Sequence, residues 1–207
     1  MSLCVALNNP SNFVIIAGDG RISKGGVIVR DDRRKMTKLT EHISIFISGA
    51  QDYCEQLRSM VAAQVNERTC IQELGLIVQK ASIEVQERFE EDYPDYLEVM
   101  PGFGALATVI AYYDKTTNES GALEFCVTDG FRPNDSRDSI LKVRGVEREK
   151  VFAYMGSQFD PSNIIEGVFG TFKYINSQTD DVGGTITLHV ISAKGTDAYE
   201  WRTSNES

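Results

Sequence analysis

The sequence has few residues that could form a metal site. Its four cysteines are scattered singly, no Cys-x-x-Cys pair occurs, and there are only two histidines in 207 residues. Protein zinc sites need clustered Cys and His ligands, so this composition argues against a metal centre, and we expect neither a metal nor a cofactor. We interpret the cysteines as reduced, mostly buried thiols.

Basic charge and long apolar runs are also scarce. The chain has 21 Lys+Arg against 30 Asp+Glu, a net charge of -9, which disfavours binding to nucleic acid or anionic lipid. The longest apolar runs, such as residues 13–17, fall far below the roughly 20 residues of a membrane-spanning helix. The first residues contain no basic and apolar export segment. We therefore expect a cytoplasmic protein that binds neither nucleic acid nor membranes.

The remaining composition is that of an ordinary globular protein, with 42% hydrophobic and 25% charged residues. No repeat or Pro/Ser-rich linker divides the chain, so we expect one domain over residues 1–207. A single core of this size buries roughly 70% of the surface that the unfolded chain exposes.

Hydrophobic patterns predict the order of the elements. Turn formers at residues 8–12 separate two apolar runs, which predicts a hairpin of strands 3–7 and 13–17, and a second strand pair is expected at 26–29 and 42–48. Apolar residues three or four apart then predict two amphipathic helices, through Leu57, Val61 and Val65 and through Leu74, Val78, Ala81 and Val85. The rest of the chain is expected to form strands at 105–113, 122–127 and 150–155, a helix at 162–176, and a closing hairpin of 185–192 and 197–201.

This order predicts an α+β fold in which helices cover the outer faces of two stacked antiparallel sheets, with a simpler α+β layer as the alternative. Several polar motifs fall at the expected ends of strands. Asp19 and Arg21 follow the second strand two residues apart, so their side chains point to one face, and Lys35 lies downstream. The remaining motifs are Ser48-Gly49-Ala50, Gly156-Ser157 and Asp180-Asp181-Val182-Gly183-Gly184. Each of them alone is typical of a turn or a helix cap.

Together and in this order, the motifs resemble those of proteasome β subunits and of the related bacterial ATP-dependent ring peptidase, which are N-terminal-nucleophile hydrolases. The residues that carry the resemblance are Ile15 to Arg21, Lys35-Met36, Ile47-Ser48-Gly49, Tyr154 to Ser157 and Gly184 to Ile191. The resemblance spans nearly the whole chain. It implies a four-layer αββα sandwich and a nucleophile at the first residue of the mature chain.

The nucleophile differs from that of the family, which usually has threonine. This chain has no Thr in its first ten positions, and symmetric pairing of the first two strands sets Ser2 roughly opposite Asp19. We expect Ser2 to act as the nucleophile once Met1 is removed, because a free α-amine with a pKa of about 7.7–8.0 can take the hydroxyl proton. Cys4 is the alternative nucleophile, if a three-residue leader is removed.

By the same resemblance, Asp19 holds Lys35 beside the nucleophile, and the Gly49 N–H stabilises the oxyanion. Ser157 and Asp181 match supporting residues near the amine, with Asp180 nearly as good a match. A plain structural ion pair of Lys35 with Asp19 is the other interpretation. His42 and His189 are interpreted as buried sheet histidines.

These observations predict a hydrolase of amide bonds, with a peptide or amide substrate, that self-associates into a ring or dimer; an ATPase partner is left open. A catalytically inactive assembly or scaffold subunit with the same fold is the second hypothesis. A metal-dependent phosphatase is the third, because Gly18 to Arg21 and Thr128 to Phe131 faintly resemble the aspartate motifs of those enzymes. The order of the two motifs argues against it.

Overall fold

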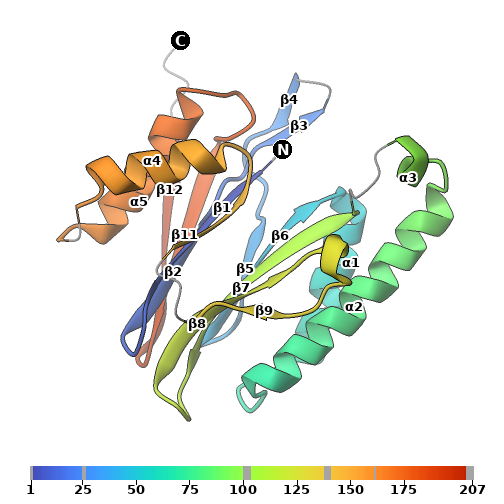
Figure 1. Ribbon diagram of the computed structural model, residues 1–207, viewed down its shortest axis with the longest axis horizontal. Coiled ribbons are helices and arrows are strands. Elements are labelled where there is room, and N and C mark those ends of the chain that lie inside the picture. The colour runs from blue at the N-terminus through green and yellow to red at the C-terminus, as the bar shows by residue number, and fades with distance from the viewer. Residues whose placement is uncertain (1, 25–26, 100–103, 138–140, 161, 204–207) are drawn as a thin grey trace.

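The computed structural model describes residues 2–24, 27–99, 104–137, 141–160 and 162–203. Over these residues the chain forms two five-stranded sheets stacked face to face, with helices on both outer faces (Figure 1). The architecture is therefore the four-layer αββα sandwich that the sequence predicts. None of the helices in the described ranges is both long and apolar enough to cross a membrane.

The first sheet has the spatial order β10 (Leu141–Gly145), β1 (Leu3–Asn9), β2 (Phe13–Gly18), β11 (Thr185–Ser192) and β12 (Gly195–Arg202). Both predicted hairpins are present, β1 with β2 and β11 with β12. The turn formers act as expected, since Ser11 adopts a positive φ and the Asn12 N–H donates to the Asn9 carbonyl. Helices α4 (Arg148–Gln158) and α5 (Ile164–Asn176) cover the outer face of this sheet.

The second sheet has the order β5 (Met36–Thr40), β6 (Ile43–Gly49), β7 (Leu106–Asp114), β8 (Glu119–Phe125) and β9 (Asn134–Asp135). Its outer face is covered by α1 (Gln51–Ala62) and α2 (Ile71–Asp92), and a short α3 (Tyr96–Val99) follows them. Leu74, Val78 and Val85 are fully buried, which confirms the helical spacing read from the sequence. A single 3₁₀ turn, η1 (Val127–Asp129), follows β8.

The inner faces of the two sheets pack together through an apolar cluster that includes Val14, Ile16, Met36 and Phe46. Gly18 at the end of β2 allows this contact, because a Cβ atom there would lie 2.5 Å from the ring of Phe46. Gly20 is equally crowded, by the backbone carbonyl of Thr185. Gly18 therefore lets β2 end against the second sheet, and Gly20 lets the chain pass close to the start of β11, with Asp19 between the two glycines.

Two predictions about strands are wrong. Residues 150–155 are part of helix α4 rather than a strand, because the buried residues Val151 and Met155 are four apart and the residues between them are exposed or half-buried. Residues 26–29 and 42–48 do not pair. Strand β4 (Val27–Arg30) instead pairs with β3 (Ile22–Lys24), whereas β6 pairs with β5 and β7; Gly26 lies outside the described residues.

Candidate active site

Ser2 is held in place from two neighbouring strands. The Leu3 N–H donates to Asp19 Oδ1 at 2.8 Å, and the Ser2 carbonyl accepts from the Val146 N–H at 3.1 Å. Because Asn9 pairs with Phe13, the register of β1 and β2 sets Leu3, rather than Ser2, opposite Asp19. The register thus differs by one residue from exact pairing of Ser2 with Asp19, and Ser2 lies beside the end of β2.

Lys35 completes the cluster. Its backbone carbonyl accepts from the Ile47 N–H at 3.0 Å, which fixes the segment before β5 against β6. The side chain is 7% exposed, and its ammonium contacts three oxygens: Ser2 Oγ at 2.9 Å, Asp19 Oδ2 at 3.0 Å and the Arg21 carbonyl at 2.6 Å. Three of the residues singled out in the sequence, Ser2, Asp19 and Lys35, therefore meet within hydrogen-bonding distance.

The carboxylate of Asp19 is fully buried. Burial raises its pKa, while the charge of Lys35 and the donors around it oppose that rise. Besides Lys35, the backbone N–H groups of Leu3 and Arg21 donate to it. The Lys35 ammonium beside this carboxylate repels a metal cation, so the environment of Asp19 gives the phosphatase hypothesis no support.

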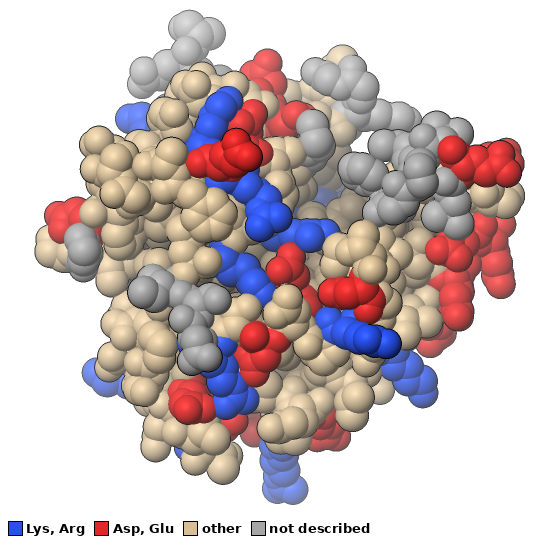
Figure 2. Space-filling view, viewed as in Figure 1, with Lys and Arg blue, Asp and Glu red and all other residues tan. Residues whose placement is uncertain are grey.

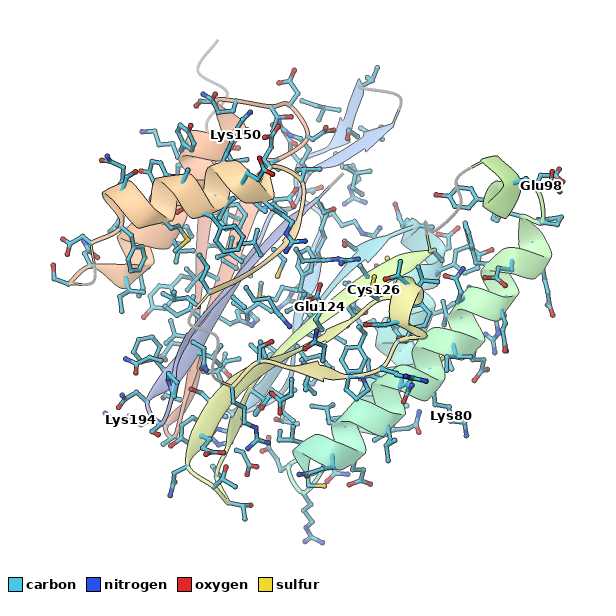
Figure 3. The ribbon with its side chains drawn as sticks, in the orientation of Figure 1. Lys80, Glu98, Glu124, Cys126, Lys150 and Lys194 are labelled. Atoms are coloured by element: carbon cyan, nitrogen blue, oxygen red, sulfur yellow. The ribbon has the colours of Figure 1, made fainter. Side chains whose placement is uncertain are left out.

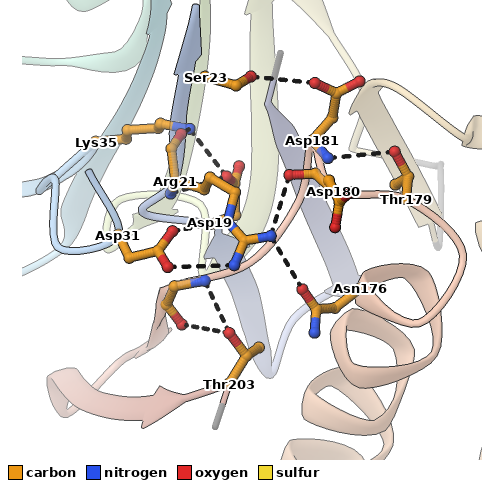
Figure 4. A network of polar contacts seen from close by, with 11 residues as sticks. Asp19, Arg21, Ser23, Asp31, Lys35, Asn176, Thr179, Asp180, Asp181 and Thr203 are labelled. Atoms are coloured by element: carbon orange, nitrogen blue, oxygen red, sulfur yellow. Dashed lines mark hydrogen bonds and ion pairs between the residues drawn. The ribbon is translucent and has the colours of Figure 1, made fainter. Parts of the chain in front are cut away.

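The side chain of Arg21 pairs with Asp31 and not with its sequence neighbour Asp19. Its guanidinium pairs with Asp31, Nε to Oδ1 at 2.7 Å and Nη2 to Oδ2 at 3.2 Å, and donates to the Asp180 carbonyl at 3.0 Å (Figure 4). Only its backbone N–H contacts the Asp19 side chain. This second ion pair ties the end of β2 to the loop after α5. Asp31 lies in a run of charged residues, 31–35, in which sequence alone does not mark it out.

Asp181 is linked to the site through one bridging residue, Ser23. Its Oδ1 accepts from Ser23 Oγ at 3.1 Å, and Ser23 lines a cavity next to Ser2 (Figure 4). Asp180 is exposed and contributes its backbone carbonyl to Arg21. Of the two aspartates left open by the sequence, Asp181 is the one whose carboxylate faces the site.

Gly49 lies where β6 ends and α1 begins, as its motif predicts. Its φ is +139°, and a Cβ atom there would lie 2.0 Å from the Ala105 carbonyl oxygen, so only glycine fits. Two cavities, of about 180 and 460 Å³, meet at this point, and Ser2, Ser48 and Gly49 line both. The arrangement provides a hydroxyl beside an ammonium group and space for a ligand on two sides.

Ser157 is the predicted site residue that the fold does not bring to this cluster. Because residues 148–158 form a helix, its hydroxyl is exposed in the last turn of α4 and donates to the Ala153 carbonyl at 2.9 Å. It is not among the described residues that line either cavity.

Cys4, the alternative nucleophile, is buried between the two sheets. Burial raises the pKa of its thiol well above the usual value, and the charges of Glu124 and Asp19 raise it further. A thiol in this environment is a poor source of thiolate. The geometry therefore favours Ser2 over Cys4.

Comparison with protein families agrees with this architecture. The family model described as proteasome subunit matches residues 4–119, more than half of the chain. The chain belongs to the proteasome subunit family. A search of curated proteins finds no match. The matched region contains Asp19, Lys35 and Gly49, and membership in the proteasome subunit family places the chain among proteins of the N-terminal-nucleophile hydrolase type.

Proposed function

We propose that the chain is an N-terminal-nucleophile hydrolase that cleaves amide bonds, most simply those of peptides, with Ser2 as its nucleophile. The contact of the Lys35 ammonium with Ser2 Oγ, 2.9 Å, carries the proposal. It sets a positive charge against the hydroxyl that must lose a proton, in a cluster where Asp19 holds the ammonium in place.

The reaction follows from this geometry once Met1 is removed. The free α-amine of Ser2 accepts the hydroxyl proton while Oγ attacks the substrate carbonyl carbon, and Lys35 stabilises the developing negative charge on Oγ. The Gly49 N–H is proposed to donate to the tetrahedral oxyanion, a type of interaction whose loss typically lowers the rate by about 10²–10³. The amine then gives its proton to the leaving nitrogen, and water hydrolyses the acyl ester on Ser2.

Each neighbouring carboxylate has a role in this scheme. Asp19 is a positioning residue, since it touches Lys35 rather than the reacting atoms. Asp181 is proposed to support the site through Ser23.

The test is a chemical one at Ser2. Protein made without an N-terminal tag is analysed by intact mass and then treated with a β-lactone that acylates nucleophilic N-terminal residues. We expect a chain shortened by one methionine that gains one acyl group, and no acylation in Ser2→Ala. Ser157→Ala is the matched control, because this exposed serine lies outside the cluster, and it should be labelled like the wild type.

A catalytically silent assembly subunit is the second candidate function. The β3–β4 hairpin favours it, because Val27 and Val29 are 67% and 59% exposed on a strand that projects from the sandwich (Figure 1). Retention of Met1 together with an absence of labelling at Ser2 would select this alternative. In either case we propose that the protein is cytoplasmic and self-associates as a ring or dimer.

A further inference from the structure

The Lys and Arg side chains that line the two cavities have no Asp or Glu beside them in the described lining, although the chain as a whole carries a net charge of -9 and several of these cations pair with carboxylates behind the walls. The charged residues in the described lining of these cavities are all basic: Arg21, Arg33, Lys35, Arg144 and Arg148. On the face shown in Figure 2, basic side chains lie across the centre of the molecule with acidic side chains next to them. An acidic protein that concentrates positive charge beside its proposed nucleophile presents a local field that attracts anions.

Lys35, Arg21 and Arg33 are matched by Asp19, Asp31 and Glu55. The two arginines at the larger cavity, Arg144 and Arg148, are less completely balanced. Glu124 is shared by two cations, Lys142 at 3.3 Å and Arg144 at 3.1 Å. Arg148, exposed in the first turn of α4, adds a further positive charge to the same wall. A negative group in the ligand would complete this arrangement.

The surroundings of the Cys126 thiol also stabilise negative charge. Cys126, labelled in Figure 3, is half-buried and lines the larger cavity. Arg144 Nη2 lies 3.0 Å and Thr128 Oγ1 3.2 Å from its sulfur. Burial acts to raise its pKa, but the hydrogen bonds of Thr128 and the charge of Arg144 outweigh it, so the pKa lies below the usual value. Negative charge is therefore stabilised at this wall of the cavity.

The larger cavity also has an apolar part, lined by Leu106, Ala107, Val127 and Val146. It thus combines an apolar surface with two guanidinium groups, which suit a carboxylate carried on an otherwise apolar chain.

We propose that this cavity binds a carboxylate of an acidic peptide through Arg144 and Arg148, so that the enzyme selects substrates with a negative charge next to the scissile amide. This inference rests on the proposed function, because it names the substrate class of the Ser2 site. The carboxylate belongs either to an Asp or Glu side chain or to the free end of a peptide.

The experiment compares matched peptides. One apolar sequence carries Asp or Asn at successive positions and ends in a carboxylate or an amide, and cleavage products are quantified by mass spectrometry. We expect kcat/KM to be about tenfold higher for a peptide with a carboxylate than for its neutral partner, a difference of about 1.4 kcal/mol. The Asp and terminal-carboxylate arms show which source the cavity prefers. Raising the ionic strength should reduce the preference, since salt screens the attraction.

Substitutions test whether Arg144 and Arg148 cause the preference for peptides with a carboxylate. In the double variant Arg144→Gln, Arg148→Gln the advantage of the charged peptides should disappear, so that charged and neutral peptides have equal kcat/KM. Glu124 keeps Lys142 as a partner in this variant, so no carboxylate is left unpaired there. Lys194→Gln is the control, because it removes one positive charge in the turn before β12, far from Cys126 (Figure 3), and should leave the preference intact.

A second measurement is independent of turnover. In Ser2→Ala protein, bound carboxylate peptides should slow the alkylation of Cys126 by iodoacetamide, and the exposed Cys70 serves as an internal reference. Equal cleavage of charged and neutral peptides, or equal protection of Cys126 by both, would overturn the inference while leaving the hydrolase intact. If Ser2 is never acylated and no peptide is cleaved, the proposed function falls, and carboxylate-dependent protection would then show an anion site without catalysis.

Discussion

At the scale of single residues, the buried pair of Lys35 and Asp19 is the feature that separates a site from an ordinary surface ion pair. Both side chains are nearly inaccessible, at 7% and 0% exposed. Removing two charges from water is unfavourable, and their attraction offsets that cost only when further hydrogen bonds are made, as Ser2, Leu3 and Arg21 do here. Such a pair contributes little net stability, but it fixes the position of an ammonium group.

Asp19→Asn tests this pair. The substitution leaves the Lys35 charge buried without its counter-ion, so we expect the free energy of unfolding to fall by about 3–5 kcal/mol and acylation of Ser2 to be lost. Denaturant unfolding and the β-lactone reaction measure the two effects. Asp32→Asn is the matched control: Asp32 pairs with Arg30 on the surface, and its loss should change stability by less than about 1 kcal/mol. Wild-type stability in Asp19→Asn would contradict the ion pair.

At the scale of elements, α4 shows that a short apolar segment can be predicted as a strand and form a helix. Residues 150–155 alternate well enough to suggest a strand, but burial selects only Val151 and Met155, which lie one helical turn apart against the first sheet. This helix also carries Ser157 away from the proposed nucleophile.

Gly156→Ala tests the helix directly. Gly156 lies inside α4, and a Cβ atom at this position would have open space around it. Because alanine is the better helix former, we expect stability to rise by about 0.5–1 kcal/mol, seen as a higher Tm. Gly49→Ala should have the opposite effect, since its Cβ would collide with the Ala105 carbonyl. A drop in Tm for Gly156→Ala would argue against the helix.

At the scale of the whole molecule, the two sheets are joined by polar as well as apolar contacts. His189 on β11 is 2% exposed, and its Nδ1 lies 2.8 Å from Ser44 Oγ on β6 of the other sheet. Burial lowers the pKa of His189 to about 4, and the charges of Arg34 and Lys38 act in the same direction. The folded protein therefore keeps this histidine neutral at pH values where the unfolded chain is protonated.

The expected consequence is a loss of stability in acid. Between the unfolded pKa near 6.5 and the folded value of about 4, the unfolded state binds more protons, so the stability present at pH 7 declines as the pH falls. The size of this component is up to about 3 kcal/mol. Urea unfolding at pH 7 and pH 4.5 measures it, and His189→Gln should remove that part of the pH dependence. An unchanged slope in the variant would refute the assignment to His189.

Self-association is also a prediction about the whole molecule. We expect light scattering to give a mass well above the 23.0 kDa of one chain. The exposed valines of β4 are the proposed contact, so Val27→Ser with Val29→Ser should shift the protein to smaller species. Leu76→Ser on α2 removes a comparably exposed side chain and is the control. A wild-type mass of one chain would disprove the assembly.

The sequence by itself determined the elements whose patterns are long and regular: both hairpins of the first sheet, the helices α1, α2 and α5, and the strands β6 and β7. It also pointed to Asp19, Lys35 and Gly49, because motifs at the ends of strands keep their order along the chain. Buried side chains recur every second residue in a strand and every third or fourth residue in a helix, so these elements can be predicted from short stretches of sequence.

Only the tertiary structure decided which groups meet. Arg21 takes Asp31 as its partner, Asp181 contacts Ser23, and β10 joins β1 across more than a hundred residues. The contact of Lys35 with Ser2 across 33 residues was implied by the family resemblance, and no local pattern predicts it. The tertiary structure also turned residues 150–155 into a helix and Cys126 toward the cavity of Ser2. The physical reason is that such pairings depend on how the layers pack and on which charges become buried together, and no local pattern in the sequence encodes that packing.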